Sequence, residues 1–190
     1  LIDPGGMPVE WDNPLPKIDL LVCTHGHFDH IWGADAFREQ TGAPVLIHPD
    51  DADALTDPSV NASRLFGRPR RFKPADRLIV DGERITLDDH HWLEVISTPG
   101  HTQGGVCLLL VRDDQPVVLF SGDTLFAGSI GRLDIGGNPA AMKRSLKRLM
   151  TLPDHVQVHP GHGPLTTIGA ERLGNPYLRL DTGSHSDFTW

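Results

Sequence analysis

The segment Thr24–His30, which reads Thr-His-Gly-His-Phe-Asp-His, limits the possible folds of this chain more than any other stretch. It places four potential metal ligands within six residues, directly after the apolar, strand-like run 18–23. These ligands are His25, His27, Asp29 and His30. Imidazole nitrogen and carboxylate oxygen are ligands that zinc and similar divalent ions prefer. Ligands on one helix face would be spaced i and i+4, so this spacing predicts a loop between a strand and a helix. The competing interpretation is a polar surface loop that happens to be rich in histidine.

Three later turns repeat one local design, in which an apolar strand-like run leads into a short turn with a ligand-type residue. The residues in question are His101, Asp123 and His162. Glycines beside them let the backbone approach a buried ion closely, and strand ends are rigid platforms from which side chains can converge. Each turn alone is weak evidence. Together, and in this order, the turns predict that these three ligands join the first four.

Composition and charge narrow the classes of function. The net charge is −8, and no long tract gathers the basic residues, which argues against nucleic-acid binding. No stretch approaches membrane-spanning length, and no signal peptide is recognisable. Cys23 and Cys107 both fall in apolar runs and are interpreted as reduced core residues, so we expect a cytoplasmic protein. The length suits a single domain over residues 1–190, with halves of roughly 1–95 and 96–190.

Apolar runs and turn residues predict strands mixed with isolated helices, an α/β layered architecture. Strands are expected at residues 18–23, 45–48, 77–80, 84–87, 92–97, 106–111, 117–121 and 156–158, and helices at 31–40, 50–55 and 139–150. Asn138 can cap the last helix, and Gly42 is well placed to end the first. Residues 56–76 lack clear periodicity and predict a long loop.

That loop holds the one local cationic cluster of the sequence, which could attract an anionic thiol conjugate to the site. A solvated loop is the simpler interpretation. The cluster consists of Arg64, Arg68, Arg70, Arg71 and Lys73. Phe66, Phe72 and Phe126 could line an apolar pocket, although core packing is the default expectation for each.

The motif set, Thr24–His30 with His101, Asp123 and His162, resembles that of the metallo-β-lactamase-fold hydrolases. The resemblance covers nearly the whole chain and is closest to the short glyoxalase II-like branch. Its supporting segments are Thr98–Thr102, Ser121–Phe126, Gly131–Asp134 and Pro160–Gly169. It implies an α/β fold, a four-layer αββα sandwich. A strand hairpin usually precedes the Asp-Pro-Gly-Gly turn in that family, so we expect the first N-terminal strands to be lacking here.

The resemblance also implies a dinuclear centre with two divalent metal ions, Zn²⁺ or alternatively Fe or Mn²⁺. His25, His27 and His101 would bind the first ion, Asp29, His30 and His162 the second, and Asp123 would bridge them. Asp29 and Asp123 are the expected catalytic carboxylates, with Asp29 orienting the attacking water. Arg132 and Asp134 are interpreted either as support for the ligands or as an ordinary surface ion pair.

The leading functional hypothesis is hydrolysis of a small-molecule thioester by a hydroxide that bridges two metal ions. Full-length glyoxalase II enzymes supply cationic residues for glutathione from a helical extension, which has no counterpart in this chain, so the carrier thiol stays open, as does the oligomeric state. One alternative is a persulfide dioxygenase-like enzyme with a single iron. Others are a lactonase or phosphodiesterase of the same fold, or a fragment without activity.

Overall fold

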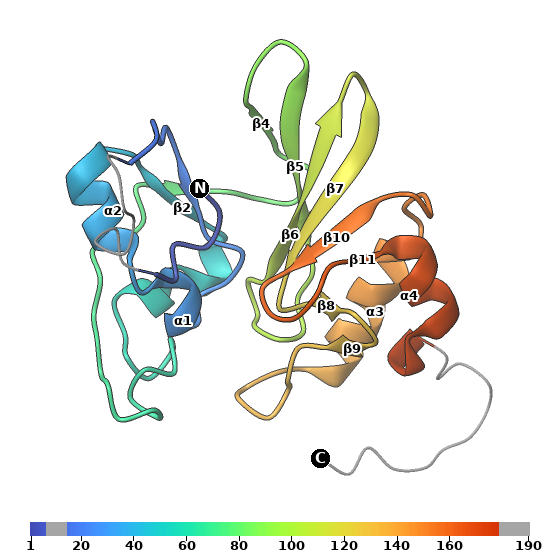
Figure 1. Cartoon of the computed structure of the whole chain (residues 1–190). Helices are drawn as coiled ribbons and strands as arrows, with labels where there is room; N and C mark the ends of the chain where they lie inside the picture. Colours follow the sequence, from blue (N-terminus) through green and yellow to red (C-terminus); the bar gives the residue numbers. More distant parts are fainter. Residues whose placement is uncertain (7–14, 179–190) are drawn as a thin grey trace.

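Two β-sheets pack face to face in the computed structural model, which describes residues 1–6 and 15–178 (Figure 1). The first sheet is parallel and has the order β1-β2-β3. Its strands are β1 (Leu21–Val22), β2 (Val45–Ile47) and β3 (Arg77–Leu78). Ile2 adds a single parallel bridge to Val22 at the β1 edge. Among the described residues the first sheet is therefore small, with three short strands and one bridge.

The second sheet has six strands in the order β11-β10-β7-β6-β5-β4. They are β4 (Arg84–Thr86), β5 (His91–Ser97), β6 (Val106–Arg112), β7 (Gln115–Gly122), β10 (Gln157–Pro160) and β11 (Thr166–Thr167). Only β10 runs parallel to its neighbour β7; the other pairs are antiparallel. A small ribbon of β8 (Leu125–Phe126) and β9 (Ser129–Ile130) follows β7. The strands of this sheet that were predicted from the sequence are all present, with ends that differ by at most two residues.

Helices cover the outer faces of both sheets, with α1 and α2 beside the first sheet and α3 and α4 beside the second (Figure 1). The α-helices are α1 (Phe28–Ile31), α2 (Ala34–Thr41), α3 (Pro139–Leu149) and α4 (Ile168–Gly174). The described residues also form two 3₁₀ helices, η2 (Pro49–Leu55) and η3 (Pro176–Leu178). Among the described residues no helix has the length and apolar character needed to cross a membrane.

Three hydrophobic clusters separate the four layers. Alternation along the strands creates them, because successive side chains point to opposite sheet faces. In β1, Leu21 packs outward with α2 and η2, whereas Val22 points inward toward the second sheet. In β6, Leu108 belongs to the inner cluster, and Cys107 packs with α3 in the third. The predicted αββα sandwich is confirmed.

The structure corrects the prediction of one helix over residues 31–40. Two helices occupy this region, and the first begins at Phe28, inside the segment that the histidine spacing had assigned to a loop. Gly42 ends α2 with φ +73°, a left-handed conformation that glycine adopts without strain, as predicted. The Asn138 side chain accepts a hydrogen bond from the Ala141 N–H at 3.0 Å, which confirms the predicted cap of α3. The ribbon β8–β9 and helix α4 were not predicted.

Candidate metal centre

All seven predicted ligands lie together at one edge of the sandwich. Loops after β1, β5, β7 and β10 carry five of them, and α1 carries Asp29 and His30. Three overlapping groups have ligand atoms within 4.8 Å of one another. The groups are His25/His27/His101, His25/His30/Asp123 and Asp29/His30/His162. Asp123 belongs to the middle group, which shares His25 with the first group and His30 with the third. A carboxylate that bridges two ions is expected in this position.

Ring nitrogens in this cluster approach each other unusually closely. His27 Nδ1 lies 2.8 Å from His101 Nε2, and His30 Nε2 lies 3.3 Å from His162 Nε2. His162 Nε2 is also 3.1 Å from the Asp29 carboxylate. Two ring nitrogens at such distances need either a shared proton or a cation between them. The donor set, five imidazoles and two carboxylates without a thiol, is suited to Zn²⁺, Fe or Mn²⁺.

Seven buried side-chain polar atoms of the described residues lack hydrogen-bond partners, and two of them belong to this cluster. They are His25 Nε2 and Asp123 Oδ1. Asp123 Oδ1 forms only an ion pair, at 3.3 Å, with His30 Nε2. Buried polar atoms are nearly always hydrogen-bonded, and an exception calls for a physical explanation. A divalent cation would satisfy both atoms, so the residues present fit a metal centre.

The far ring nitrogens are held by groups outside the cluster, which fixes the orientation of the histidines. His101 Nδ1 donates to the Arg132 backbone carbonyl at 2.7 Å, and His25 Nδ1 lies 3.1 Å from Thr24 Oγ1. In both cases Nε2 is turned toward the cluster. The side chain of Arg132 instead pairs with exposed Asp134. Its backbone thus supports a ligand while its side chain forms a surface ion pair.

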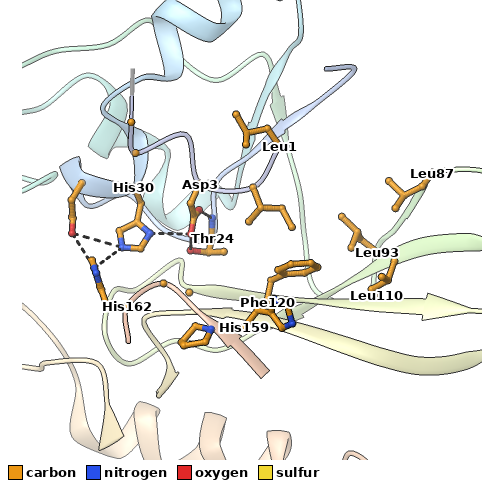
Figure 2. A pocket seen from close by; sticks show the side chains of 17 residues that line it. Leu1, Asp3, Thr24, His30, Leu87, Leu93, Leu110, Phe120, His159 and His162 are labelled. Carbon is orange, nitrogen blue, oxygen red and sulfur yellow. Dashed lines mark hydrogen bonds and ion pairs between the residues drawn. The ribbon is translucent and has the colours of Figure 1, made fainter. Parts of the chain in front are cut away.

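Asp3 contacts the candidate ligand His30, and the sequence reasoning missed it. Its carboxylate accepts hydrogen bonds from the Thr24 N–H at 2.7 Å and the Thr24 hydroxyl at 2.8 Å, and it lies 2.9 Å from His30 Nδ1 (Figure 2). It therefore joins the first turn of the chain to the His-rich segment. The available signal was an acidic residue in the turn Asp3–Gly6 at the end of a strand-like run. Nothing local indicated its partners, which lie 21 and 27 residues away.

The histidines of the cluster differ in the direction in which their pKa is shifted. Burial, together with the neighbouring histidines, lowers the pKa of His25 and of His27, the latter to about 4. Both rings are therefore neutral near pH 7, the form that binds metals. Burial also opposes charge on His30, but the neighbouring carboxylates of Asp123 and Asp3 raise its pKa to about 10. Metal binding would displace this proton, because a ligating imidazole must give up its Nε2 hydrogen.

The cluster is open on one side. The His162 and Asp29 side chains are 56% and 41% exposed, whereas His25, His27 and His101 are buried. A groove of about 710 Å³ begins at Asp29, His30 and His162 and continues along apolar side chains of the second sheet (Figure 2). Those side chains are Leu87, Leu93, Leu110 and Phe120. A reactant can therefore reach the second group of ligands but not the first.

The three phenylalanines that could line a pocket according to the sequence lie in different surroundings. Phe72 is a core residue, Phe66 is half exposed with its ring 5.1 Å from Phe28, and Phe126 lies 6.3 Å from the His162 ring. Phe126 therefore lies beside an exposed candidate ligand, whereas Phe66 packs on Phe28 at the start of α1. Within the part of the chain that the structure describes, Cys23 and Cys107 are buried free thiols and do not form a disulfide.

Comparison with known proteins identifies the family. Residues 1–162 match the family model described as "Metallo-beta-lactamase superfamily". The probable metallo-hydrolase YqgX of Bacillus subtilis is 39% identical over 185 residues, which cover 94% of this chain and 86% of YqgX. The hydroxyacylglutathione hydrolase GloC of Haemophilus influenzae is 32% identical, with the same coverages.

Solved structures agree with this assignment. The BLEG-1 B3 metallo-beta-lactamase superposes with a TM-score of 0.85 at 39% identity, covering 94% of this chain and 87% of its own. TTHA1623 in a di-iron-bound form gives 0.74 at 37% identity, with coverages of 93% and 88%. ETHE1 from Myxococcus xanthus gives 0.67 at 29%, with coverages of 92% and 71%. This chain belongs to the metallo-beta-lactamase superfamily.

Proposed function

We propose that this chain is a dinuclear metal-dependent hydrolase that cleaves a small-molecule thioester by glyoxalase II-like chemistry. The observation that carries the proposal is the convergence of seven ligand-type side chains, two of which hold buried atoms without partners. The resemblance of the chain to GloC supports thioester hydrolysis, and the resemblance to YqgX supports a metallo-hydrolase in general. The di-iron form of TTHA1623 supports iron as well as zinc as the resident metal.

The seven residues divide into a closed and an open half. In the closed half, His25, His27 and His101 would hold one ion away from solvent, with Asp123 between the two ions. In the open half, Asp29, His30 and His162 would hold the second ion beside the groove. Divalent ions bound there would supply Lewis-acid activation of water and of a carbonyl oxygen.

The residues of the open half would then position the reaction. Asp29 is half exposed and 3.1 Å from His162 Nε2, so its carboxylate can orient a water molecule and accept its proton. Oxygen of that water bonds to the carbonyl carbon, and the C–S bond then breaks with its electron pair on sulfur. The proton that Asp29 accepted passes to the thiolate, so the products are a carboxylic acid and a thiol. A thiolate leaves readily, and this makes a strong general acid unnecessary.

The surroundings of the open half favour a substrate with both apolar and anionic parts. The groove offers leucine side chains and Phe120, and the ring of Phe66 packs 5.1 Å from that of Phe28, the residue before Asp29. Arg70, Arg71 and Lys73 of the cationic cluster have partners within the protein: aromatic rings, the Thr56 carbonyl and Glu39. Arg64 and Arg68 are exposed on either side of Phe66 and are placed to attract an anionic conjugate.

A direct test combines a thioester assay with an oxygen electrode. Protein reconstituted with Zn²⁺, Fe²⁺ or Mn²⁺ should hydrolyse S-2-hydroxyacyl thioesters of glutathione or of a smaller thiol, and Asp123→Ala should lose at least 100-fold in kcat/KM. Asp53→Asn, an exposed change on η2, is the matched control and should keep full activity. Oxygen uptake with a persulfide by the iron-loaded chain, without thioester cleavage, would contradict the proposal in favour of the single-iron alternative.

A further inference from the structure

The buried carboxylate of Asp51 connects two loops that are far apart in sequence. Asp51 lies in η2 and is only 5% exposed. Its Oδ2 accepts a hydrogen bond from the Gly26 N–H at 2.9 Å, and its Oδ1 accepts one from the Gly104 N–H at 2.7 Å. Both bonds are buried, so each oxygen has one well-placed donor and little access to water. A buried carboxylate that accepts two backbone N–H groups forms strong, charge-assisted bonds.

The two glycines lie within the ligand loops themselves. Gly26 stands between His25 and His27, and Gly104 lies three residues after His101. These three histidines form the buried group of candidate ligands. On the strand side of the loops, the Val106 N–H donates to the Thr24 carbonyl at 2.8 Å. Asp51 supplies the second connection, so the two loops are tied together at two separate points.

Close packing explains why both donors are glycines. A Cβ at Gly104 would lie 2.5 Å from the Asp51 backbone nitrogen and 2.8 Å from its Cβ, closer than real Cβ atoms come. A Cβ at Gly26 would overlap the Ala54 side chain of the same 3₁₀ helix. The loops therefore lie directly on η2, and the carboxylate reaches both amides without an intervening water.

We propose that Asp51 is a positioning residue for the metal centre, because it fixes the separation between the His25/His27 loop and the His101 loop. The inference rests on the proposed metal site, since its consequence is the geometry of three ligands. Asp51→Asn keeps the shape of the side chain but turns one acceptor into a donor that faces an N–H group. At least one of the two loops then loses its bond, and the three ring nitrogens are no longer held at the spacing that an ion needs.

The test measures metal affinity and coordination instead of activity. The metal-free chain is titrated with Zn²⁺ against a competing chelator, and with Co²⁺ while its visible absorption is recorded. We expect Asp51→Asn to weaken Zn²⁺ binding by about 10–100-fold, the usual effect of losing a partner behind the ligands, and to change the Co²⁺ spectrum. Asp53→Asn, on the same helix but exposed, should leave both unchanged.

A second control separates positioning from stability alone. Leu55→Val lowers the melting temperature through the core next to η2 but leaves the carboxylate in place, and it should not alter metal affinity. Wild-type affinity for Asp51→Asn, with an unchanged Co²⁺ spectrum, would overturn the role of Asp51. Failure of the unmodified chain to bind any metal would instead refute the metal centre.

Hydrogen exchange on the unmodified chain keeps the inference testable if Asp51→Asn does not fold. The N–H groups of Gly26 and Gly104 should exchange slowly even in the metal-free protein, because the carboxylate and not the ion holds them. Exchange of either amide at the rate of an open loop before metal is added would overturn the proposal.

Discussion

Replacing Asp3 with Asn should weaken both the fold and the metal centre. The carboxylate accepts two hydrogen bonds from Thr24 and contacts His30 Nδ1 at 2.9 Å, and its side chain is only 15% exposed. Hydrogen bonds to charged groups contribute about 1.5–3 kcal/mol each, and they are not additive when they share one acceptor. An Asn side chain keeps one acceptor and adds a donor. We therefore expect the free energy of unfolding of the metal-free chain to fall by about 2–4 kcal/mol.

The Asp3→Asn change should also weaken metal binding. With Asp3 neutral, His30 loses the anion that orients its ring, so metal affinity should fall by about 10–100-fold. Urea unfolding followed by circular dichroism gives the first quantity, and a chelator competition gives the second. Asp19→Asn is the matched control, because Asp19 pairs with Lys17 at the surface and its loss should cost less than about 1 kcal/mol. Equal, small effects of Asp3→Asn and Asp19→Asn on both quantities would refute the reasoning.

Three further predictions concern other parts of the molecule. Buried Glu171 accepts hydrogen bonds from Gly128 N–H, the Thr166 hydroxyl and the Asn175 amide, so Glu171→Gln should lower stability by about 2–3 kcal/mol and the melting temperature by about 4–12 °C. An unchanged melting temperature would contradict this. Phe66→Ala should raise KM for an anionic thioester about 2–10-fold with little change in kcat. Leu78 of β3 is equally exposed, and Leu78→Ala should leave KM unchanged. Equal effects of the two changes on KM would show that Phe66 is not part of the site. Burial raises the pKa of both thiols, that of Cys107 to about 11, so neither cysteine should react with a thiol reagent until the chain is unfolded. Stoichiometric labelling of the native protein would show that the thiols are accessible.

Local patterns were sufficient to predict much of the fold and of the candidate site. An apolar strand followed by a tight turn and a ligand-type residue is a local signal, and it located His101, Asp123 and His162. The cap of α3 was equally local, since Asn138 and Pro139 are adjacent to the helix that they begin. Five of the six strands of the second sheet were predicted, whereas the two-residue strand β11 was missed.

Contacts over long sequence separations could not be predicted in this way. In the sequence, Asp51 is only an acidic residue near the start of a predicted helix. The two N–H groups that donate to it, those of Gly26 and Gly104, lie 25 and 53 residues away. Asp3 likewise has its partners 21 and 27 residues away. The helix that begins at Phe28 was missed because alternating ligands were taken to favour an extended loop, whereas only His25 and His27 alternate and Asp29 and His30 already lie in the helical turn.

The central claim is that the seven side chains form one centre for two metal ions. Anomalous diffraction from crystals of the reconstituted protein, recorded at the absorption edge of the bound metal, tests it most directly. The account predicts two peaks per chain. One should lie about 2.0–2.2 Å from nitrogens of His25, His27 and His101, and the other at similar distances from Asp29, His30 and His162, with Asp123 between them. A single peak, or metal bound away from these residues, would contradict it.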